Sequence, residues 1–468
     1  MWAAAAAVAA RPTASVFAAE KPKKVGANER IRIACIGFNG QGKSHISYYA
    51  GRDDVEIAYL CDADASLQDM AIKIVESKGK KAPRFVQDMR RIFDDKSVDA
   101  VSSATPNHWH ALVAIWAMQS GKDVYVEKPA SHNVSEGRRM VEVARKENRI
   151  CQIGTQCRSM KGSIEAIEFL RSGKIGKILV ARGLCYKRRD SIGKCGGPQK
   201  PPASVDYNLW LGPAPEKPVM RKRFHYDWHW QWDYGNGDLG NQGIHQMDLA
   251  RWGLGLDRLP NSVIGLGGRF GYEDDGQTPN THLTFLDYGD AQLIFETRGL
   301  ETSDYKGAKI GVIYHGTEGY LVLPKYSGGA AFDLQGNKIA EFEGGGDHHG
   351  NFLNAVRSRN YRDLHADVLE GHLSSALCHL GNVSYLVGQD VPFSQQSKAF
   401  GDNKEAYEAF ERMCEHLKDN RVPIDGMKYR LGKKLLIDPA TETFTNDAQA
   451  NALLTREYRK PFVVPQKV

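Results

Sequence analysis

The chain has 468 residues, which at about 150 residues per domain allows two or three domains. Hydrophobic residues make up 41% and charged residues 25% of it, so disorder, coiled coil and collagen are excluded as descriptions of the whole chain. The net charge of +6, from 62 Lys and Arg against 56 Asp and Glu, is too small an excess to indicate a nucleic-acid-binding protein.

The first residues have the composition of an export signal. Residues 1–19 are small and apolar, and Val16-Phe17-Ala18 fits a small-residue cleavage site. We therefore expect a signal remnant and linker over residues 1–26 and a periplasmic or otherwise exported protein. Since Arg11 is the only basic residue of this stretch, an Ala-rich leader on a cytoplasmic protein is the alternative. After residue 20 no apolar run approaches the ~20 residues of a membrane-spanning helix, and we expect no membrane span.

Short apolar runs alternate with amphipathic stretches from Ile31 onward. This alternation predicts a parallel sheet with helices on both faces, which is a doubly wound α/β domain over residues 27–155. The expected strands are residues 31–36, 55–61, 98–104, 124–126 and 150–153, and the expected helices are residues 43–49, 67–76, 111–118 and 135–146.

The regularity fades after Gly154, where strands dominate and turn signals are frequent. We expect an α+β second domain over residues 156–425 with an antiparallel or mixed sheet. Its expected strands are residues 177–186, 282–285, 291–296 and 309–314, and its expected helices are residues 163–172, 351–357 and 369–386. The polar tail over residues 426–468 is expected to pack on the surface.

A glycine-rich turn joins the first strand to the first helix. Its residues are Gly37, Phe38, Asn39, Gly40, Gln41 and Gly42, with Asn39 where the G-x-G-x-x-G fingerprint has its middle glycine. Backbone N–H groups at such a helix start can bind a pyrophosphate. The second strand ends in Asp62, and an acid there accepts ribose hydroxyls and repels a 2′-phosphate, so we expect NAD, with NADP disfavoured. A structural turn without a ligand is the alternative.

A lysine stands at the carboxyl end of another predicted parallel strand, the edge at which open α/β sheets bind ligands. Glu127-Lys128-Pro129 follows the strand at residues 124–126. Lys128 can donate a proton or a hydrogen bond to an alcohol or carbonyl oxygen, with Glu127 beside it. A surface Lys-Pro turn is the alternative.

The segment after residue 104 ends at the same edge of the sheet. Its Thr105, Pro106 and Asn107 are expected to pass the cofactor with their backbone, and His110 follows one helical turn later. His110 can also cap or pack against the following helix.

One stretch of the second domain, residues 237–252, starts loosely and becomes helical. Asn241 and His245 are four residues apart and share one helix face, with Asp248 three residues further on. A histidine so placed can take the proton from a substrate hydroxyl while hydride leaves its carbon. A satisfied core histidine is the alternative.

Taken in this order, these motifs resemble the Gfo/Idh/MocA oxidoreductase family, which includes glucose–fructose oxidoreductase and inositol dehydrogenase. The resemblance covers roughly residues 30–390. It implies an N-terminal Rossmann domain, a C-terminal domain with a large open, mostly antiparallel sheet, and NAD(P)-dependent redox chemistry on sugars or cyclitols. By this match Lys128 and His245 are the catalytic pair, with Asn241 beside them. We expect a homodimer or homotetramer.

The chain departs from that family at Asn241, where inositol dehydrogenase-like members carry Asp. Asn can hydrogen-bond a hydroxyl but cannot take its proton or favour imidazolium by its charge. An NAD-dependent glycosidase or lyase, which oxidises its substrate only transiently, is therefore an alternative to a net oxidoreductase. A cofactor-binding protein with a structural or sensing role is the third hypothesis.

Aromatic residues are dense just before that helix. Trp228, Trp230 and Trp232 are expected to form the wall of a carbohydrate pocket together with Asn241, His245 and Asp248, because aromatic faces suit the C–H faces of a sugar; a loop-and-core cluster is the alternative. His225 and His229 lack an evident third ligand, and we expect no metal. Basic residues at 186–189 and 194–200 form either a solvated loop or a contact to an acidic substrate or a neighbouring subunit.

Overall fold

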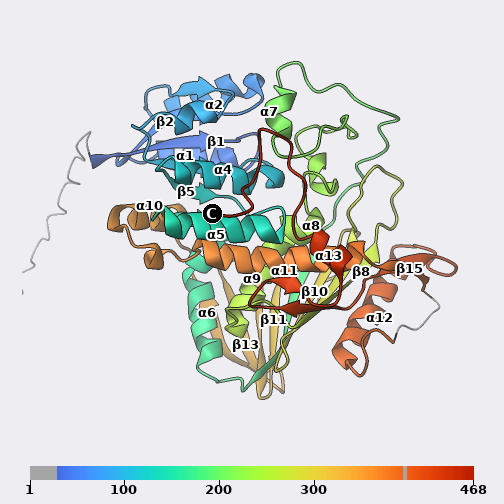
Figure 1. Cartoon of the computed structure of the whole chain (residues 1–468). Helices are drawn as coiled ribbons and strands as arrows, with labels where there is room; N and C mark the ends of the chain where they lie inside the picture. Colours follow the sequence, from blue (N-terminus) through green and yellow to red (C-terminus); the bar gives the residue numbers. More distant parts are fainter. Residues whose placement is uncertain (1–28, 394–397) are drawn as a thin grey trace, which may run out of the picture.

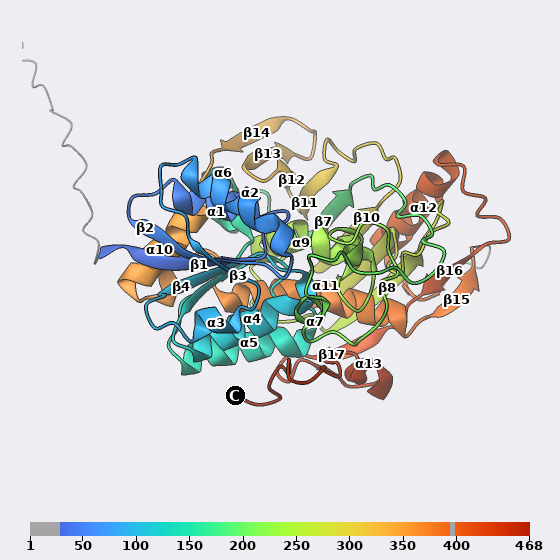
Figure 2. The same cartoon turned by 90° about the horizontal axis from the view of Figure 1, so that it is seen from above.

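The computed structural model describes residues 29–393 and 398–468. In this part of the chain a smaller and a larger sheet lie in separate layers, with helices between them (Figures 1 and 2). The predicted export signal and linker, residues 1–26, lie outside the described residues. Of the helices described, none is both long enough and apolar enough to cross a membrane.

The smaller sheet is parallel throughout, with the strand order β3-β2-β1-β4-β5-β6. Every residue of β4 and β5 is buried, as expected for strands between two helical layers. The predicted doubly wound α/β domain is thus confirmed, and β3 and α3 are additions to the prediction. Its elements are β1 (Ile31–Ile36), α1 (Gly42–Ala50), β2 (Val55–Cys61), η2 (Ala65–Leu67), α2 (Gln68–Glu76), β3 (Arg84–Val86), α3 (Arg90–Phe93), β4 (Ala100–Ser103), α4 (Asn107–Gln119), β5 (Asp123–Val126), α5 (Val134–Lys146) and β6 (Cys151–Ile153).

The larger sheet has the order β14-β13-β12-β11-β7-β10-β9-β8-β16-β15, with β17 also paired to β8. Its pairs are antiparallel except β7 with β10, so the predicted mostly antiparallel sheet is confirmed. The strands are β7 (Ile178–Tyr186), β8 (Ser262–Gly268), β9 (Thr281–Asp287), β10 (Gln292–Arg298), β11 (Ile310–Gly316), β12 (Gly319–Lys325), β13 (Gly328–Asp333), β14 (Lys338–Glu343), β15 (Gln389–Pro392), β16 (Lys428–Leu431), β17 (Leu435–Asp438) and β18 (Thr443–Phe444). The helical elements of this part are η3 (Gln156–Ser159), α6 (Lys161–Arg171), α7 (Tyr207–Leu211), η4 (Asp227–Trp230), α8 (Gly237–Asn241), α9 (Gly243–Leu254), α10 (His348–Ser358), η5 (Tyr361–Asp363), α11 (Val368–Leu386), α12 (Lys404–Asp419) and α13 (Ala448–Ala452).

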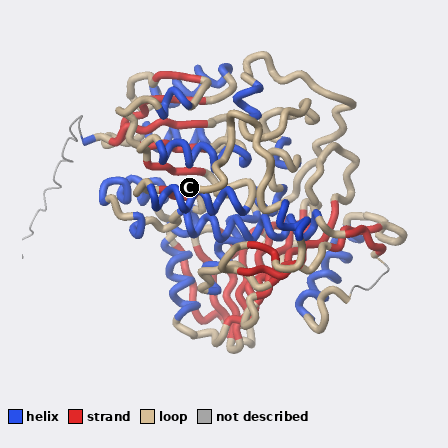
Figure 3. The backbone as a smooth tube through the Cα atoms, in the orientation of Figure 1, coloured by secondary structure: helices blue, strands red, loops and turns tan. Residues whose placement is uncertain are grey.

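Alternate residues of the central strands build two different cores. On the face toward the smaller sheet, Ala181 of β7 and Phe295 of β10 pack with α9 and α11, the helices that separate the two sheets in Figures 1 and 3. On the opposite face, Val180 and Ile294 pack with the apolar side of α12. The period of two along a strand explains this division.

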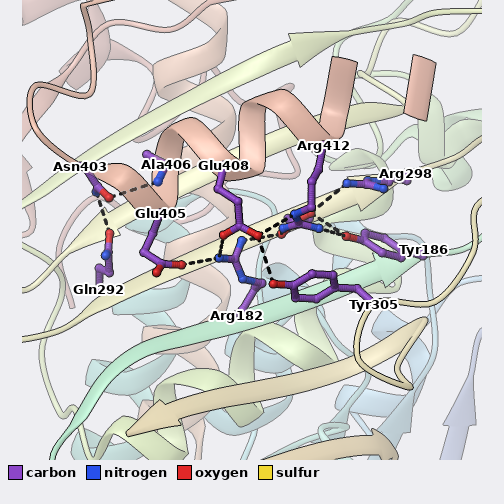
Figure 4. Close-up of polar contacts among 11 residues, drawn as sticks. Arg182, Tyr186, Gln292, Arg298, Tyr305, Asn403, Glu405, Ala406, Glu408 and Arg412 are labelled. Carbon is purple, nitrogen blue, oxygen red and sulfur yellow. Dashed lines mark hydrogen bonds and ion pairs between the residues drawn. The ribbon is translucent and has the colours of Figure 1, made fainter. Parts of the chain in front are cut away.

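Polar contacts also attach α12 to the outer face of the sheet (Figure 4). Arg182 on β7 is fully buried and donates to Glu405 and Glu408 on α12 at 2.6 and 3.1 Å. The hydroxyl of Tyr305 also donates to Glu408, at 3.1 Å. Helices of the second domain therefore cover both faces of its central strands. A site shared by the two domains has to lie on the side that faces the first domain.

Two later segments of the chain pack into or against the first domain. Phe352 and Leu353 of α10 join the core built on α1 and β1. In the tail, β16 and β17 pair with β8, and Phe462 is buried against Trp109 and Trp116 of α4. Figure 1 shows the dark-red end of the chain running up to the smaller sheet. Residues 426–468, expected to pack on the surface, also contribute apolar residues to the cores of both domains.

Candidate functional site

A cleft opens at the carboxyl ends of the strands of the smaller sheet. Its floor contains almost all of the residues predicted to bind the cofactor: Gly37, Phe38, Asn39, Gly40, Gln41, Asp62, Thr105, Pro106, Asn107, His110, Glu127 and Lys128. Gly42 does not line it. A side chain at Gly42 would lie 2.0 Å from the carbonyl oxygen of Gly37, so this glycine lets α1 pack onto the turn.

The turn has the shape that close approach of a pyrophosphate requires. Gly37 has a φ of +76°, and a Cβ there would lie 2.8 Å from the backbone nitrogen of Thr105. A Cβ at Gly40 would meet nothing within 4 Å, so the cleft is open beside it. The carboxylate of Asp62 accepts the N–H groups of Phe38 and Asp64 at 2.9 and 3.0 Å, which fixes an anion at the end of β2. These features fit a dinucleotide.

Residues of the second domain and the tail form the roof of the cleft. The lining residues from these segments are Leu209, Trp210, His225, Tyr226, Trp228, His229, Asn241 and Phe462. Nε2 of His225 lies 2.8 Å from Oδ2 of Asp64, and the indole N–H of Trp109 donates to the carbonyl of Trp210 at 3.0 Å. These two contacts connect the second domain to the first domain. Of these residues Trp228 and Asn241 were predicted, whereas Leu209 and Trp210 were missed because α7 is a five-residue helix in an irregular segment.

Lys128 lies where the floor meets the second domain. Its Nζ donates to the backbone carbonyl of Asn241 at 3.0 Å, which brings two predicted catalytic residues together. Burial lowers the pKa of Lys128, and Lys187 and Arg189 lower it further, against the opposing charge of Glu127. A lysine with a lowered pKa in a cleft is suited to proton donation and to hydrogen bonding of a substrate oxygen.

Two residues that the sequence analysis did not single out, His45 and Ser102, form a chain of hydrogen bonds that ends at Glu127. Nε2 of His45 lies 3.1 Å from Oε1 of Glu127, and Nδ1 of His45 lies 2.8 Å from the hydroxyl of Ser102. Burial raises the pKa of Glu127, but the hydrogen bond from His45 and the charges of His45 and Lys128 outweigh it and lower that pKa to about 2. Glu127 is therefore a fixed anion beside Lys128.

His245 lies near Lys128 but deeper in the protein. It is 4% exposed and is not among the described residues that line the cleft, and within the described ranges its Nδ1 has no hydrogen-bond partner. Its ring centroid lies 4.9 Å from that of Tyr326. Burial lowers the pKa of His245 to about 3, and the charge of Lys128 adds to the effect. The imidazole is thus neutral at pH 7 and able to accept a proton.

The structure separates Asp248 from this group. Its carboxylate is fully buried, accepts Nε of Arg158 at 2.8 and 3.0 Å, and accepts the hydroxyl of Ser374 at 2.6 Å. The expectation that Asp248 binds substrate is therefore wrong, because the helix turns it from the side of Asn241 and His245 into the interior of the second domain. Its contacts assign it to holding α9 in place.

The three predicted tryptophans have different positions. Trp228 lines the cleft and stacks on His229 with 3.7 Å between ring centroids. Trp230 is buried, with the guanidinium carbon of Arg189 5.4 Å from its ring centroid, and neither it nor Trp232 is among the described lining residues. Trp228 alone of the three is thus placed on the cleft wall.

The ring of His110 contacts the backbone near Lys128. Its two ring nitrogens lie 2.6 Å from the carbonyl oxygen of Pro129 and 2.7 Å from that of Thr105. It therefore fixes the two strand ends that meet at the cleft. His110 also lines the cleft.

Two family models match most of the chain. The model of the Gfo/Idh/MocA oxidoreductase family, NAD-binding Rossmann fold, matches residues 31–155, and the model of the family's C-terminal alpha/beta domain matches residues 177–421. A WlbA dehydrogenase from Bordetella pertussis, solved with NADH and UDP-GlcNAcA, has a TM-score of 0.54 and 20% identity over 75% of this chain and 95% of its own, which shows the same fold.

Curated relatives are similar over shorter segments. A glycosyl hydrolase family 109 protein of Shewanella pealeana is 28% identical over 155 residues, which are 32% of this chain and 34% of that protein. An alpha-N-acetylgalactosaminidase of Shewanella oneidensis is 28% identical over 181 residues, 37% of this chain and 39% of that protein. The match thus spans little more than a third of these relatives. Together with the two domain matches, the cleft and its glycine-rich turn show that the chain belongs to the Gfo/Idh/MocA oxidoreductase family, with the Rossmann domain as its NAD-binding part.

Proposed function

We propose that the protein is an NAD-dependent oxidoreductase that acts on a CH–OH group of a sugar, cyclitol or glycoside. The observation that carries this proposal is the position of Lys128, at the end of β5 in the dinucleotide cleft and against the backbone of Asn241. A hydrogen-bond donor with a lowered pKa and a neutral histidine can serve as the group that holds the alcohol oxygen and the base that takes its proton.

Each residue of the proposed site has its own role. NAD, when bound, supplies the acceptor for the hydride. Lys128 donates a hydrogen bond to the substrate oxygen and holds it in place, while His245 takes the hydroxyl proton. The carbinol loses a hydride and a proton and becomes a carbonyl, so the electrons balance. Lys128 and His245 are the catalytic residues of this proposal, and Asn241 fixes the lysine through its carbonyl.

The second candidate function is a glycosidase or lyase that returns the hydride to its substrate. The glycosyl hydrolase family 109 protein and the alpha-N-acetylgalactosaminidase favour it, since each is 28% identical to about a third of this chain. We would purify the protein without added nucleotide, identify any nucleotide released on denaturation, and add free sugars and aryl glycosides. Reduced nicotinamide accumulating with a free sugar supports the oxidoreductase. Release of the aglycone with no net reduction of the nucleotide supports the second candidate. If neither reduced nicotinamide nor free aglycone appears, both candidate functions are contradicted.

We also propose export to the periplasm, a homo-oligomeric state and a carbohydrate as the small-molecule partner. Residues 1–19 support export by composition alone. Because an exported enzyme has no obvious pool of free NAD, slow release from the roofed cleft follows from this proposal. Slow release makes a second substrate, or the return of the hydride, necessary in each catalytic cycle.

The carboxylate of Asp62 is expected to favour NAD over NADP. A 2′-phosphate placed against it brings like charges together, which costs several kcal/mol. Asp62→Asn removes the charge but keeps an oxygen for one of the two backbone N–H groups, so the preference should narrow by about tenfold or more. Fluorescence titration of both nucleotides measures this. Tighter binding of NADP to the parent protein would refute it.

Asn241→Asp is expected to change the pH profile of the reaction. Asn241 is the last residue of α8 and His245 lies in the first turn of α9, so a carboxylate at residue 241 favours the imidazolium and raises the pKa of His245 from its low value. Since the neutral imidazole takes the proton, the acid limb of the rate profile should move to higher pH. A limb that stays in place would show that residue 241 does not face the reacting groups.

A further inference from the structure

The cofactor cleft has an apolar end on the side of β3. Its lining residues there follow β3 or belong to α4 and α7: Met89, Arg90, Trp116 and Leu209. Asp62 ends the neighbouring strand β2 and lines the same cleft. A dinucleotide places its pyrophosphate at the turn after β1 and its ribose at the acid after β2. The adenine, which follows the ribose, therefore belongs at this apolar end.

The C-terminal tail closes this end of the cleft. Phe462 lines the cleft, and its ring centroid lies 5.5 Å from that of Trp109 and 6.2 Å from that of Trp116. The guanidinium carbon of Arg90 lies 5.6 Å from the same ring centroid. Phe462 is only 1% exposed, so it forms the back wall of the cleft rather than a surface open to water. One aromatic side chain of the tail and two of α4 thus build one wall.

Arg459 connects the tail to the roof helix α7 through all three nitrogens of its guanidinium. Nη1 donates to Oδ1 of Asn208 and Nη2 to the carbonyl of the same residue, both at 2.6 Å. Nε donates to the carbonyl of Gly212 at 3.0 Å. The guanidinium carbon also lies 4.9 Å from the ring centroid of Phe462, so one side chain contacts both the roof and the wall. Figure 1 shows the dark-red tail rising from α13 toward α7.

The tail is attached to the first domain on both sides of Arg459. Before it, the hydroxyl of Tyr458 donates to Oε1 of Glu136 on α5 at 3.1 Å. After it, Phe462 and Val464 are buried in the core of the first domain. This attachment lies beyond residues 177–421, which the model of the family's C-terminal domain matches. It is therefore a feature of this chain's own C-terminal segment.

We infer that the tail is part of the cofactor site: Phe462 closes the adenine end of the cleft, and Arg459 keeps it closed while NAD is bound. The adenine then contacts side chains from segments far apart in the sequence, and these contacts have to break before the nucleotide leaves. The tail therefore slows the release of NAD more than it changes the rate of binding. This inference gives the proposed slow release a structural cause. It rests on NAD binding and holds for either candidate reaction.

The test measures NAD release and the binding of ADP-ribose, which carries the adenine but no nicotinamide, with the full-length protein. A chase of bound labelled NAD with unlabelled NAD gives the release rate, and competition by ADP-ribose gives its affinity. Phe462→Ala removes the wall, and Arg459→Met removes three hydrogen bonds to the roof. Each variant should speed the release of NAD and weaken the binding of ADP-ribose by about tenfold.

Two residues of the same tail supply matched controls. Val464 shares the core of the first domain with Phe462 but is not among the described residues that line the cleft. Arg430 on β16 pairs with Asp390 on β15, at 3.0 Å, within the second domain. Val464→Ala and Arg430→Met should therefore keep the release rate and the affinity of the parent protein.

The outcomes separate this inference from the proposed function. Parent-like release and affinity in either Phe462→Ala or Arg459→Met overturn it. So does a Val464→Ala variant that changes both quantities as much as Phe462→Ala, since the first domain would then be loosened as a whole. If Phe462→Ala has no thermal transition, Phe462→Leu replaces it under the same criteria. None of these measurements uses turnover, so a protein that retains NAD through its tail but oxidises no sugar leaves the inference standing and contradicts the oxidoreductase.

Discussion

Lys128→Met is expected to lower the turnover rate by about 10²–10⁴-fold while NAD remains bound. Methionine has nearly the volume of lysine but removes the ammonium group that donates a hydrogen bond to the substrate oxygen. Nucleotide binding should persist, because Asp62 and the turn at residues 37–42 are unchanged. Steady-state rates with a substrate of the parent enzyme, together with the nucleotide content of the purified variant, measure the two effects separately.

The control for this variant is Lys194→Gln, because the side chain of Lys194 is 62% exposed. It should keep the parent rate, so a loss confined to residue 128 reports the site rather than a general change in charge. A Lys128→Met variant that is fully loaded with nucleotide and turns over at nearly the parent rate would remove Lys128 from the chemistry. An unfolded variant is recognised by its lost thermal transition, and Lys128→Gln then replaces it.

Asp248→Asn is expected to destabilise the protein by roughly 3–5 kcal/mol. The change leaves the buried guanidinium of Arg158 without its main anion, since Glu370 meets only one of its nitrogens, at 3.0 Å, and is itself 35% exposed. The free energy of unfolding in urea measures this loss. The apparent affinity for the sugar should stay that of the parent at temperatures where the variant is folded, because Asp248 does not line the cleft.

Asp290→Asn supplies the comparison for that experiment. Asp290 is 94% exposed and lies 3.9 Å from Lys177, so its loss should change the stability by less than about 0.5 kcal/mol. An Asp248→Asn variant as stable as Asp290→Asn, but with weakened sugar binding, would restore the role in substrate binding that its place in the sequence had suggested.

Local patterns were sufficient for the first domain. The strands β1 and β2 have the predicted bounds, because their apolar runs end at the glycine-rich turn and at Asp62. The strand β3 was missed because it has three residues, one of them the exposed Arg84. The helix α4 starts at Asn107, after Pro106, rather than at the predicted residue 111, and α5 starts at Val134, one residue before its predicted start, where Asn133 caps it.

Features built from distant segments could not be read from one sequence. Phe462 lines the cleft only because the tail, which has no regular pattern, packs back against Trp109 and Trp116 of α4. The spacing of Asn241, His245 and Asp248 predicted helical structure but neither the division at Gln242, which puts Asn241 on α8 and His245 on α9, nor the direction of each side chain. Residues three apart lie on neighbouring parts of a helix, and here only the tertiary contacts of Asp248 show which way it faces.

The most direct test of the central claim is the transfer of the carbinol hydrogen itself. A sugar that the parent enzyme accepts, deuterated at the carbon to be oxidised, is mixed with the NAD-loaded protein for a single turnover, and the nucleotide is isolated for mass spectrometry. The account predicts one deuterium in the reduced nicotinamide of the parent and none in the Lys128→Met variant on the same time scale. Oxidised sugar with no deuterium in the nucleotide would contradict it.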